Sequence, residues 1–426
     1  MKRGLIFLII ILVIILGCTK KKNPTGFDPS FELKTKIIDW KYFDRAYSYE
    51  DSIRNSDFTN LILGNFNNIS ANILMKFTAF PDSVFEVENA KIKMTINKKY
   101  NFDNVSADDI KLGYLNTNWK ESSVTWFTTG DSLNWKNSTE FSEEDFTPID
   151  YLNFEVLDDT VSFEFDNNIV KNWINTDSLN CGIVLYTQKD SAFIVFNSSE
   201  IGSDEIEPTL SFDYKITADD TLMHYQKNSY YDTFIYHKID NGDLQYFNNK
   251  IFLSGIMPVA SYIHFNLPDS LFFSESNNEI DNHYESKRIT VLRAELLLYP
   301  KEEQNYPLNS DFTIKPYLVI SDSANSQNPN TPLEYRTDYI SYGKVSDDSL
   351  YVEEFKIDVT SVVQSIIAGT YVNSEEEFEC NNYGMLLKTL KENVSFANIE
   401  FYSIVAQEVE KRPKLVIKYI TPKFDY

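Results

Sequence analysis

The chain has 426 residues, of which 42% are hydrophobic and 24% are charged, which excludes a disordered chain and makes two domains the expected number. Lys and Arg total 39 against 63 Asp and Glu, a net charge of −24, so neither nucleic acid nor an anionic membrane surface is expected as an electrostatic partner. The 27 Tyr and 31 Phe, beside only 13 Gly and 14 Pro, favour an all-β protein over one built on glycine-rich phosphate loops.

The first residues have the pattern of a secretory signal. Two basic residues precede an uninterrupted apolar run from Leu5 to Leu16, and Gly17 and Cys18 follow it. As a helix this run is about 18 Å long, too short for a hydrocarbon core of about 30 Å, so it fits a signal peptide better than a permanent span. Its end resembles a bacterial lipobox, which implies that residues 1–17 are removed and that Cys18 carries the lipid.

The segment after the signal is expected to be a lipidated tether. Residues 18–30 contain three successive lysines and Pro24 and offer no apolar face to bury, so the first folded segment is expected near residue 31. More than one acyl chain on Cys18 would give lasting attachment to a membrane. An aspartate directly after the lipidated cysteine would favour retention in the inner membrane. This chain has Thr19 there, which favours attachment to the outer membrane of the cell envelope. The sequence does not distinguish the periplasmic face of that membrane from its surface face.

The rest of the chain contains an internal duplication, because landmarks of residues 31–217 return in residues 218–426 at offsets of about 190 to 205 residues. The matching landmarks are Leu63-Gly64 and Ser254-Gly255, Phe77 and Phe265, Asp166 and Asp358, Gly182-Ile183-Val184-Leu185 and Gly384-Met385-Leu386-Leu387, and Pro208-Thr209-Leu210 and Pro413-Lys414-Leu415. Their common order predicts two tandem domains of one fold. The polar stretch 219–232 is expected to link them.

Within each half, the apolar residues alternate with polar ones. Ala90, Ile92 and Met94 alternate with Lys91, Lys93 and Thr95, for example, and this period predicts strands with one buried face. Short strands separated by Asn, Asp and Ser predict antiparallel two-sheet sandwiches rather than βαβ units.

One short helix is expected in each half, directly after Asp166 and after Asp358. Both segments carry the same apolar spacing, at Ile169, Val170, Trp173 and Ile174 and at Val362, Val363, Ile366 and Ile367. A stripe of this kind predicts packing against the protein's own sandwich.

A longer motif adds a family resemblance. Trp119, Glu121, Val124, Thr125 and Trp126 form one spaced motif, and Phe165-Asp166 with Val170 and Trp173 form a second. Residues 58–216 thereby resemble the DNRLRE, or disaggregatase-related, domain, and the second half keeps the frame without any tryptophan. The resemblance implies jelly-roll-like β-sandwich modules of secreted or cell-surface proteins, some of them carbohydrate-binding, and a chain that is not itself an enzyme.

The candidate ligand-stacking residues are aromatic. Trp119, Trp126 and Trp135 lie close to Tyr114 in the sequence, and sugar rings stack on indole and phenol faces. The alternative is that Trp119 and Trp126 pin a long loop to the core, each with its indole N–H bonded inside the protein.

No residue set predicts a catalytic or metal site. Cys181 and Cys380 are expected to be free thiols in separate domains, although a disulfide between them stays an alternative. The four histidines lack the spacing of metal ligands. Asp158-Asp159 and Asp347-Asp348 fit hairpin turns; a structural Ca²⁺ is the alternative use of clustered carboxylates, and no other cofactor is expected.

Two classes of function follow. The favoured one is a non-catalytic envelope lipoprotein that binds another envelope protein in assembly or adhesion. The alternative is a lipid-anchored carbohydrate-binding module, for which the acidic net charge favours neutral polysaccharides. A polysaccharide-active enzyme is the least favoured, because no hydrolase motif occurs and no pair of carboxylates stands out.

Overall fold

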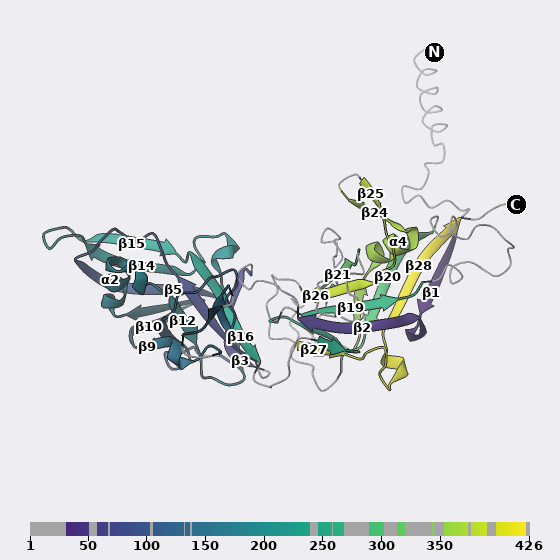
Figure 1. The fold of residues 1–426 in the computed structure, drawn as a ribbon, viewed down its shortest axis with the longest axis horizontal. Coiled ribbons are helices and arrows are strands. Elements are labelled where there is room, and N and C mark those ends of the chain that lie inside the picture. The colour runs from purple at the N-terminus through teal and green to yellow at the C-terminus, as the bar shows by residue number, and fades with distance from the viewer. Residues whose placement is uncertain are drawn as a thin grey trace, which may run out of the picture.

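The computed structural model describes most of the chain from Phe31 onward (Figure 1). The described residues are 31–50, 58–66, 69–102, 105–131, 133–136, 139–238, 246–257, 259–267, 289–301, 313–320, 343–344, 353–373, 376–389 and 398–422. The expected signal peptide, Cys18, the tether and Asp347-Asp348 lie outside these ranges. None of the described helices is long and apolar enough to cross a membrane.

The predicted all-β architecture is confirmed. Figure 1 shows two groups of strands, which we call the first body (residues 58–238) and the second body (residues 31–50 and 246–422). All strand pairs in the described chain are antiparallel. Each body contains one α-helix within the described residues.

The first body is two layers joined by one long strand. Its elements are β3 (Asn60–Phe66), β4 (Ile69–Lys76), β5 (Glu86–Tyr100), β6 (Lys111–Leu115), β7 (Thr128–Gly130), β8 (Leu133–Asn134), β9 (Phe146–Ile149), β10 (Tyr151–Leu157), β11 (Thr160–Phe165), α2 (Asn167–Asn175), β12 (Ile183–Tyr186), β13 (Ala192–Asn197), β14 (Thr209–Lys215), β15 (Met223–Asn228) and β16 (Tyr231–Lys238). The first part of β5 pairs with β11 and β14, and its last part pairs with β13. The predicted alternation holds there, since Ala90, Ile92 and Met94 are buried and Lys93 is exposed.

The second body repeats this plan with fewer described residues. Its elements are β1 (Phe31–Ile38), β2 (Phe43–Glu50), β17 (Tyr246–Asn248), β18 (Ile251–Ser254), β19 (Val259–Phe265), β20 (Thr290–Leu298), β21 (Thr313–Leu318), β22 (Gly343–Lys344), β23 (Phe355–Asp358), α4 (Thr360–Ala368), β24 (Thr370–Asn373), β25 (Glu376–Glu379), β26 (Met385–Thr389), β27 (Asn398–Phe401) and β28 (Lys414–Pro422). One layer has the order β1-β28-β20-β23, and the other has the order β17-β2-β19-β26-β21-β22.

The strand neighbours support the internal duplication. The pairing β15-β14-β5-β11 of the first body corresponds to β1-β28-β20-β23 of the second. Likewise β16-β4-β12-β6 corresponds to β2-β19-β26-β21. The first body and the second body therefore contain the same arrangement of paired strands.

The sheets do not divide at residue 217, where the sequence pattern places the domain boundary. β1 and β2 belong to the first half of the sequence, but they pair with β28 and β19 of the second body. β15 and β16 belong to the second half, but they pair with β14 and β4 of the first body. Alternation reveals that a strand has a buried face and does not reveal which sheet edge it joins.

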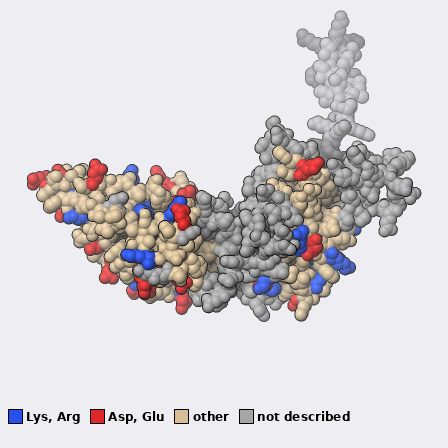
Figure 2. Space-filling model, in the orientation of Figure 1, with Lys and Arg blue, Asp and Glu red and all other residues tan. Residues whose placement is uncertain are grey.

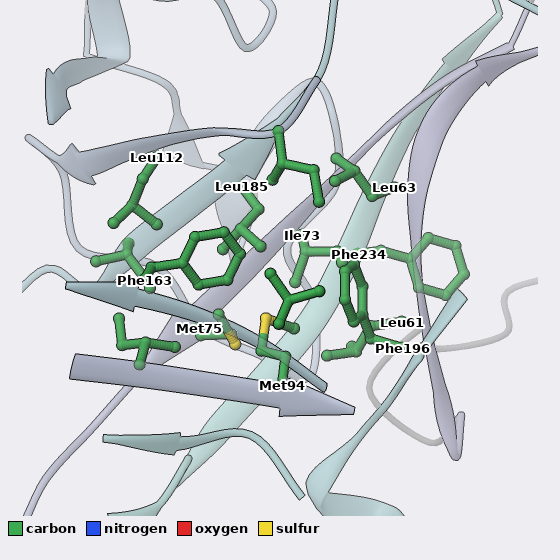
Figure 3. Packing of buried hydrophobic residues seen from close by; sticks show 14 of the residues in the cluster. Leu61, Leu63, Ile73, Met75, Met94, Leu112, Phe163, Leu185, Phe196 and Phe234 are labelled. Atoms are coloured by element: carbon green, nitrogen blue, oxygen red, sulfur yellow. The ribbon is translucent and has the colours of Figure 1, made fainter. Parts of the chain in front are cut away.

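The exchange also corrects the expected linker. Residues 219–232 contain all of β15 and the start of β16. Tyr225 and Phe234 belong to the core of the first body, and Figure 3 shows Phe234 beside Leu61 and Phe196 of β3 and β13. These two strands are part of a fold and do not merely connect two folds.

The two helices lie where the sequence predicts them, and each packs on its own body. Helix α2 buries Val170, Trp173 and Ile174, and the carboxylate of Asp166 caps its N-terminus by accepting from the N–H of Asn168 at 2.9 Å. Helix α4 buries the predicted stripe of Val362, Val363, Ile366 and Ile367 and ends at Gly369, which has φ +69°. Each stripe is therefore core packing.

Two equivalent glycines precede equivalent strands at close contacts between backbones. Gly182 has φ +88°, and a Cβ there would lie 2.4 Å from the carbonyl oxygen of Met75. Gly384 has φ +85°, and a Cβ there would lie 2.6 Å from the carbonyl oxygen of Ile263. Both positions need glycine because of the left-handed backbone and because of the neighbouring strand.

Substituting Gly182 tests the close contact between the two backbones. We expect Gly182→Ala to destabilise the first body by on the order of 3 kcal/mol, because it combines backbone strain with a steric overlap. Gly202→Ala is the matched control: Gly202 has φ +69°, and a Cβ there would meet no heavy atom of the described chain within 4 Å, so only strain of about 1 kcal/mol is expected. Urea unfolding measures both, and equal losses would contradict the close approach.

Candidate functional site

The sheet of β4, β12 and β16 is buried on both faces. Ile73 and Met75 point into the main core, whereas Leu74 between them belongs to a second apolar cluster. Val184 of β12 and Ile235 of β16 join Leu74 there. Because neighbouring residues of a strand point to opposite faces, the second cluster, which we call the outer cluster, lies on the outer face. Aromatic residues of the segment 119–146 complete it.

Trp119 and Trp135, two of the four candidate ligand-stacking residues, are buried in this outer cluster. Trp119 is 7% exposed and Trp135 is 2% exposed. The indole N–H of Trp119 donates to the carbonyl of Cys181 at 3.0 Å, and that of Trp135 donates to the carbonyl of Thr125 at 3.2 Å. Neither ring offers a face to a ligand, because both are buried in the outer cluster.

Trp126 differs from the other two tryptophans. Its half-buried ring stacks on the imidazole of His237, with ring centroids 5.3 Å apart at 17°. Phe127, which is 52% exposed, meets the same imidazole edge-on. Among the described residues, no acceptor pairs with the indole N–H of Trp126. We call Trp126, Phe127 and His237 the aromatic group.

Tyr114 lies apart from the tryptophans. It is half-buried on β6, opposite Ile183, and packs against the main core. Its neighbour Leu115 is the residue of β6 that joins the outer cluster. The four aromatic candidates therefore lie on opposite faces of one sheet, although they are close in the sequence.

A buried carboxylate at the start of β16 was not found by sequence reasoning. Asp232 is 1% exposed, and it accepts from the hydroxyl of Ser198 at 2.6 Å, from the backbone N–H of Ser199 at 2.9 Å and from the hydroxyl of Ser229. Its own backbone N–H donates to Glu121 at 2.8 Å. A buried carboxylate needs such donors, so this group anchors β16 in the first body. Glu121 belongs to the spaced tryptophan motif, which is the signal that could have pointed here.

Cys181 and Cys380 are free thiols, as the sequence analysis favoured. Burial raises the pKa of Cys380 to about 11, and burial also raises the pKa of Cys181. A raised pKa lowers the thiolate fraction that a nucleophile or metal ligand needs. Asp158 has φ +53° between β10 and β11, so the Asp158-Asp159 pair forms the expected hairpin turn.

The described residues contain no group of three or more His, Cys, Asp and Glu side chains arranged to hold a metal. In the view of Figure 2, acidic and basic side chains are interspersed on the described surface. A surface of mixed sign has no extended field of one sign to attract a polyelectrolyte.

The comparisons with known proteins give no family. No family model matches the chain, and no curated protein matches it. Among solved structures, a 35 kDa C-terminal fragment of the major pilin GBS80 of Streptococcus agalactiae is 11% identical, with 86% of this chain and 94% of that chain covered. The TM-score of 0.20 is too low for this likeness to carry an argument.

Trp135 and Trp126 should differ in their contribution to stability. We expect Trp135→Phe to destabilise the first body by about 2 kcal/mol, because the substitution leaves the carbonyl of Thr125 without its donor and leaves a small cavity. Trp126→Phe should cost under about 0.5 kcal/mol, since no bonded N–H is lost at a half-exposed position. Thermal unfolding of both variants measures the difference, and the reverse order would contradict the assignment.

Proposed function

We propose that this chain is a non-catalytic lipoprotein of the cell envelope, attached through lipid on Cys18 to the outer membrane, with a structural or protein-binding role in envelope assembly or adhesion. The burial of Trp119 and Trp135 carries the proposal. A glycan site would expose these indole rings to solvent. Here both rings cover the outer face of a sheet, and their N–H groups donate to backbone carbonyls of the protein. The resemblance to DNRLRE modules, which are not themselves enzymes, is consistent with this role.

The edge strand β10 is the surface that we assign to a protein partner. Among the described strands, β10 pairs only with β11, so its outer edge presents backbone groups that another strand can bond. Leu152 and Leu157 on this strand are 69% and 65% exposed. Apolar side chains beside a free strand edge fit a protein partner better than a sugar.

Cross-linking in cells tests the partner. A photo-reactive amino acid in place of Leu152 in the full chain should capture one protein in stoichiometric amount. The same residue in place of Leu292 is the control, because Leu292 is 47% exposed but lies on β20, which has strands on both sides. Capture from both positions, or from neither, would argue against an interaction at β10.

The aromatic group supports a second candidate function, the binding of a neutral polysaccharide. Within the described part of the chain, Trp126 keeps an unbonded indole N–H beside its partly exposed ring, and Phe127 is exposed next to it. An exposed aromatic surface with a free donor is what stacking of a sugar ring requires. This site uses one of the four aromatic residues singled out in the sequence.

Affinity-gel electrophoresis separates the two functions. If polysaccharide binds here, Trp126→Ala with Phe127→Ala should abolish the retardation of the chain by a neutral polysaccharide. Phe85→Ala is the control, because Phe85 is 53% exposed elsewhere on the first body. No retardation of the unaltered chain by any neutral or acidic polysaccharide, with or without Ca²⁺, would remove the carbohydrate function.

A further inference from the structure

The strand pair β1 and β2 completes a body from which it is separated in the sequence by residues 51–245. β1 pairs with β28 from Phe31 opposite Pro422 to Ile38 opposite Leu415. β2 lies between β19 and β17 and pairs with both. The whole first body, residues 58–238, lies between this strand pair and the rest of the second body in the sequence.

The strand pair is part of the second body's core. Ile38, Phe43 and Ala46 are buried members of the same apolar cluster as β19, β20 and β28. The rings of Phe43 and Phe265 lie 5.7 Å apart. The guanidinium of Arg412 lies 4.3 Å from the ring centroid of Trp40, in the turn between β1 and β2. Without these strands the second body would expose this core and two sheet edges.

Polar contacts also hold β2 in place. The hydroxyl of buried Ser48 lies 2.7 Å from that of Ser261, and it accepts from the backbone N–H of Phe252 at 2.8 Å. The imidazole of His264 contacts Asp44 of β2 through Nδ1 and the carbonyl of Asn382 through Nε2 at 3.1 Å. The acceptor surface is thus matched to β2 in both its apolar and its polar groups.

The matching is selective, because β15 and β16 do not fit the same place. Asp232 lies opposite Met75 in the first body, and Ala46 lies opposite Ile263 in the second. These are equivalent positions, since Met75 and Ile263 pair with Ile183 and Met385 in turn. At the place of Ala46, the carboxylate of Asp232 would be buried without Ser198 and Ser199, two of the donors that it has in the first body.

Every copy of the chain carries both this strand pair and the surface that accepts it. The strand pair makes the same contacts with the rest of the second body whether both belong to one chain or to two chains. The two arrangements differ only in the covalent connection and in the effective concentration of the strand pair. Twelve residues at most about 40 Å long separate a lipid on Cys18 from β1, so anchored copies would hold donors and acceptors in one thin layer. This step rests on the proposed anchorage.

We infer that β1 and β2 form a donor element that is exchanged between copies of this chain, so that anchored neighbours complete one another's second body. The partner is a second copy of the chain. The acceptor surface is made of the edges of β28 and β19 that β1 and β2 cover, together with the part of the second core against which Ile38 and Phe43 pack.

Two variants of the full chain, each with one added cysteine, test the exchange. Thr35 and Lys418 are opposite each other on β1 and β28, and both are exposed. Differently tagged Thr35→Cys and Lys418→Cys chains are co-expressed and oxidised with diamide. Exchange predicts a disulfide-linked heterodimer carrying both tags, several-fold above the level given by the unsubstituted tagged chains.

A matched pair in the first body supplies the control. Ser211 and Gln226 are opposite each other on β14 and β15, but these strands are consecutive in the sequence and close within one chain. Ser211→Cys with Gln226→Cys chains should therefore give no heterodimer above background. A chain carrying both Thr35→Cys and Lys418→Cys reports whether the bond can form at all.

The outcomes are distinct. A heterodimer from the β1 and β28 pair alone supports exchange. No heterodimer, when the doubly substituted chain forms its bond within one chain, overturns exchange. The mass of the chain and a Cys18→Ser variant report lipidation separately, so a failure of the proposed anchorage is read from the missing lipid and a failure of exchange from the missing heterodimer.

Discussion

The structure depends on the pairing of β1 with β28, which joins the first described strand to the last. This pairing and that of β2 with β19 complete the second body, whose remaining strands all follow residue 245. All described strands of the first body lie within residues 58–238, and Ile256, Met257 and Val259 join its core from later in the sequence. Contacts between distant parts of a chain form late, because the entropy of closing the loop must be offset first. The first body can therefore fold during synthesis, while the second waits for the end of the chain.

The two bodies share one arrangement of paired strands and differ in the side chains that cover the outer face of the sheet. In the first body, Leu74 of β4 is covered by Trp119 and Trp135 from the segment 119–146. In the second body, Tyr262 belongs to the corresponding cluster on β19, where its ring lies 4.8 Å from that of Tyr47 and its hydroxyl donates to the carbonyl of Tyr383 at 2.7 Å. Changes in the covering residues leave strand pairing intact, which explains how the two halves diverged without losing their common arrangement.

Much of the fold was predictable because its signals are local. The alternation of Ala90, Ile92 and Met94 identified β5, and the stripe with Val362 and Ile366 identified α4. The candidate site was harder. Trp119, Trp126, Trp135 and Tyr114 were singled out as candidate ligand-stacking residues, but Trp119 and Trp135 are buried in the outer cluster and Tyr114 lies on the other face of the sheet. Asp232 was missed because its donors, Ser198 and Ser199, lie over thirty residues earlier.

The all-β class, the internal duplication, the two helices and the turn at Asp158 could all be predicted from the amino-acid sequence, because each follows from spacing within a few residues or from an order of landmarks. The pairing of β1 and β2 with β28 and β19, and that of β15 and β16 with β14 and β4, became visible in the folded protein alone. The physical reason is that equivalent strands of a duplicated chain present similar apolar faces, so buried contacts such as those of Asp232 and Ser48 select the partner.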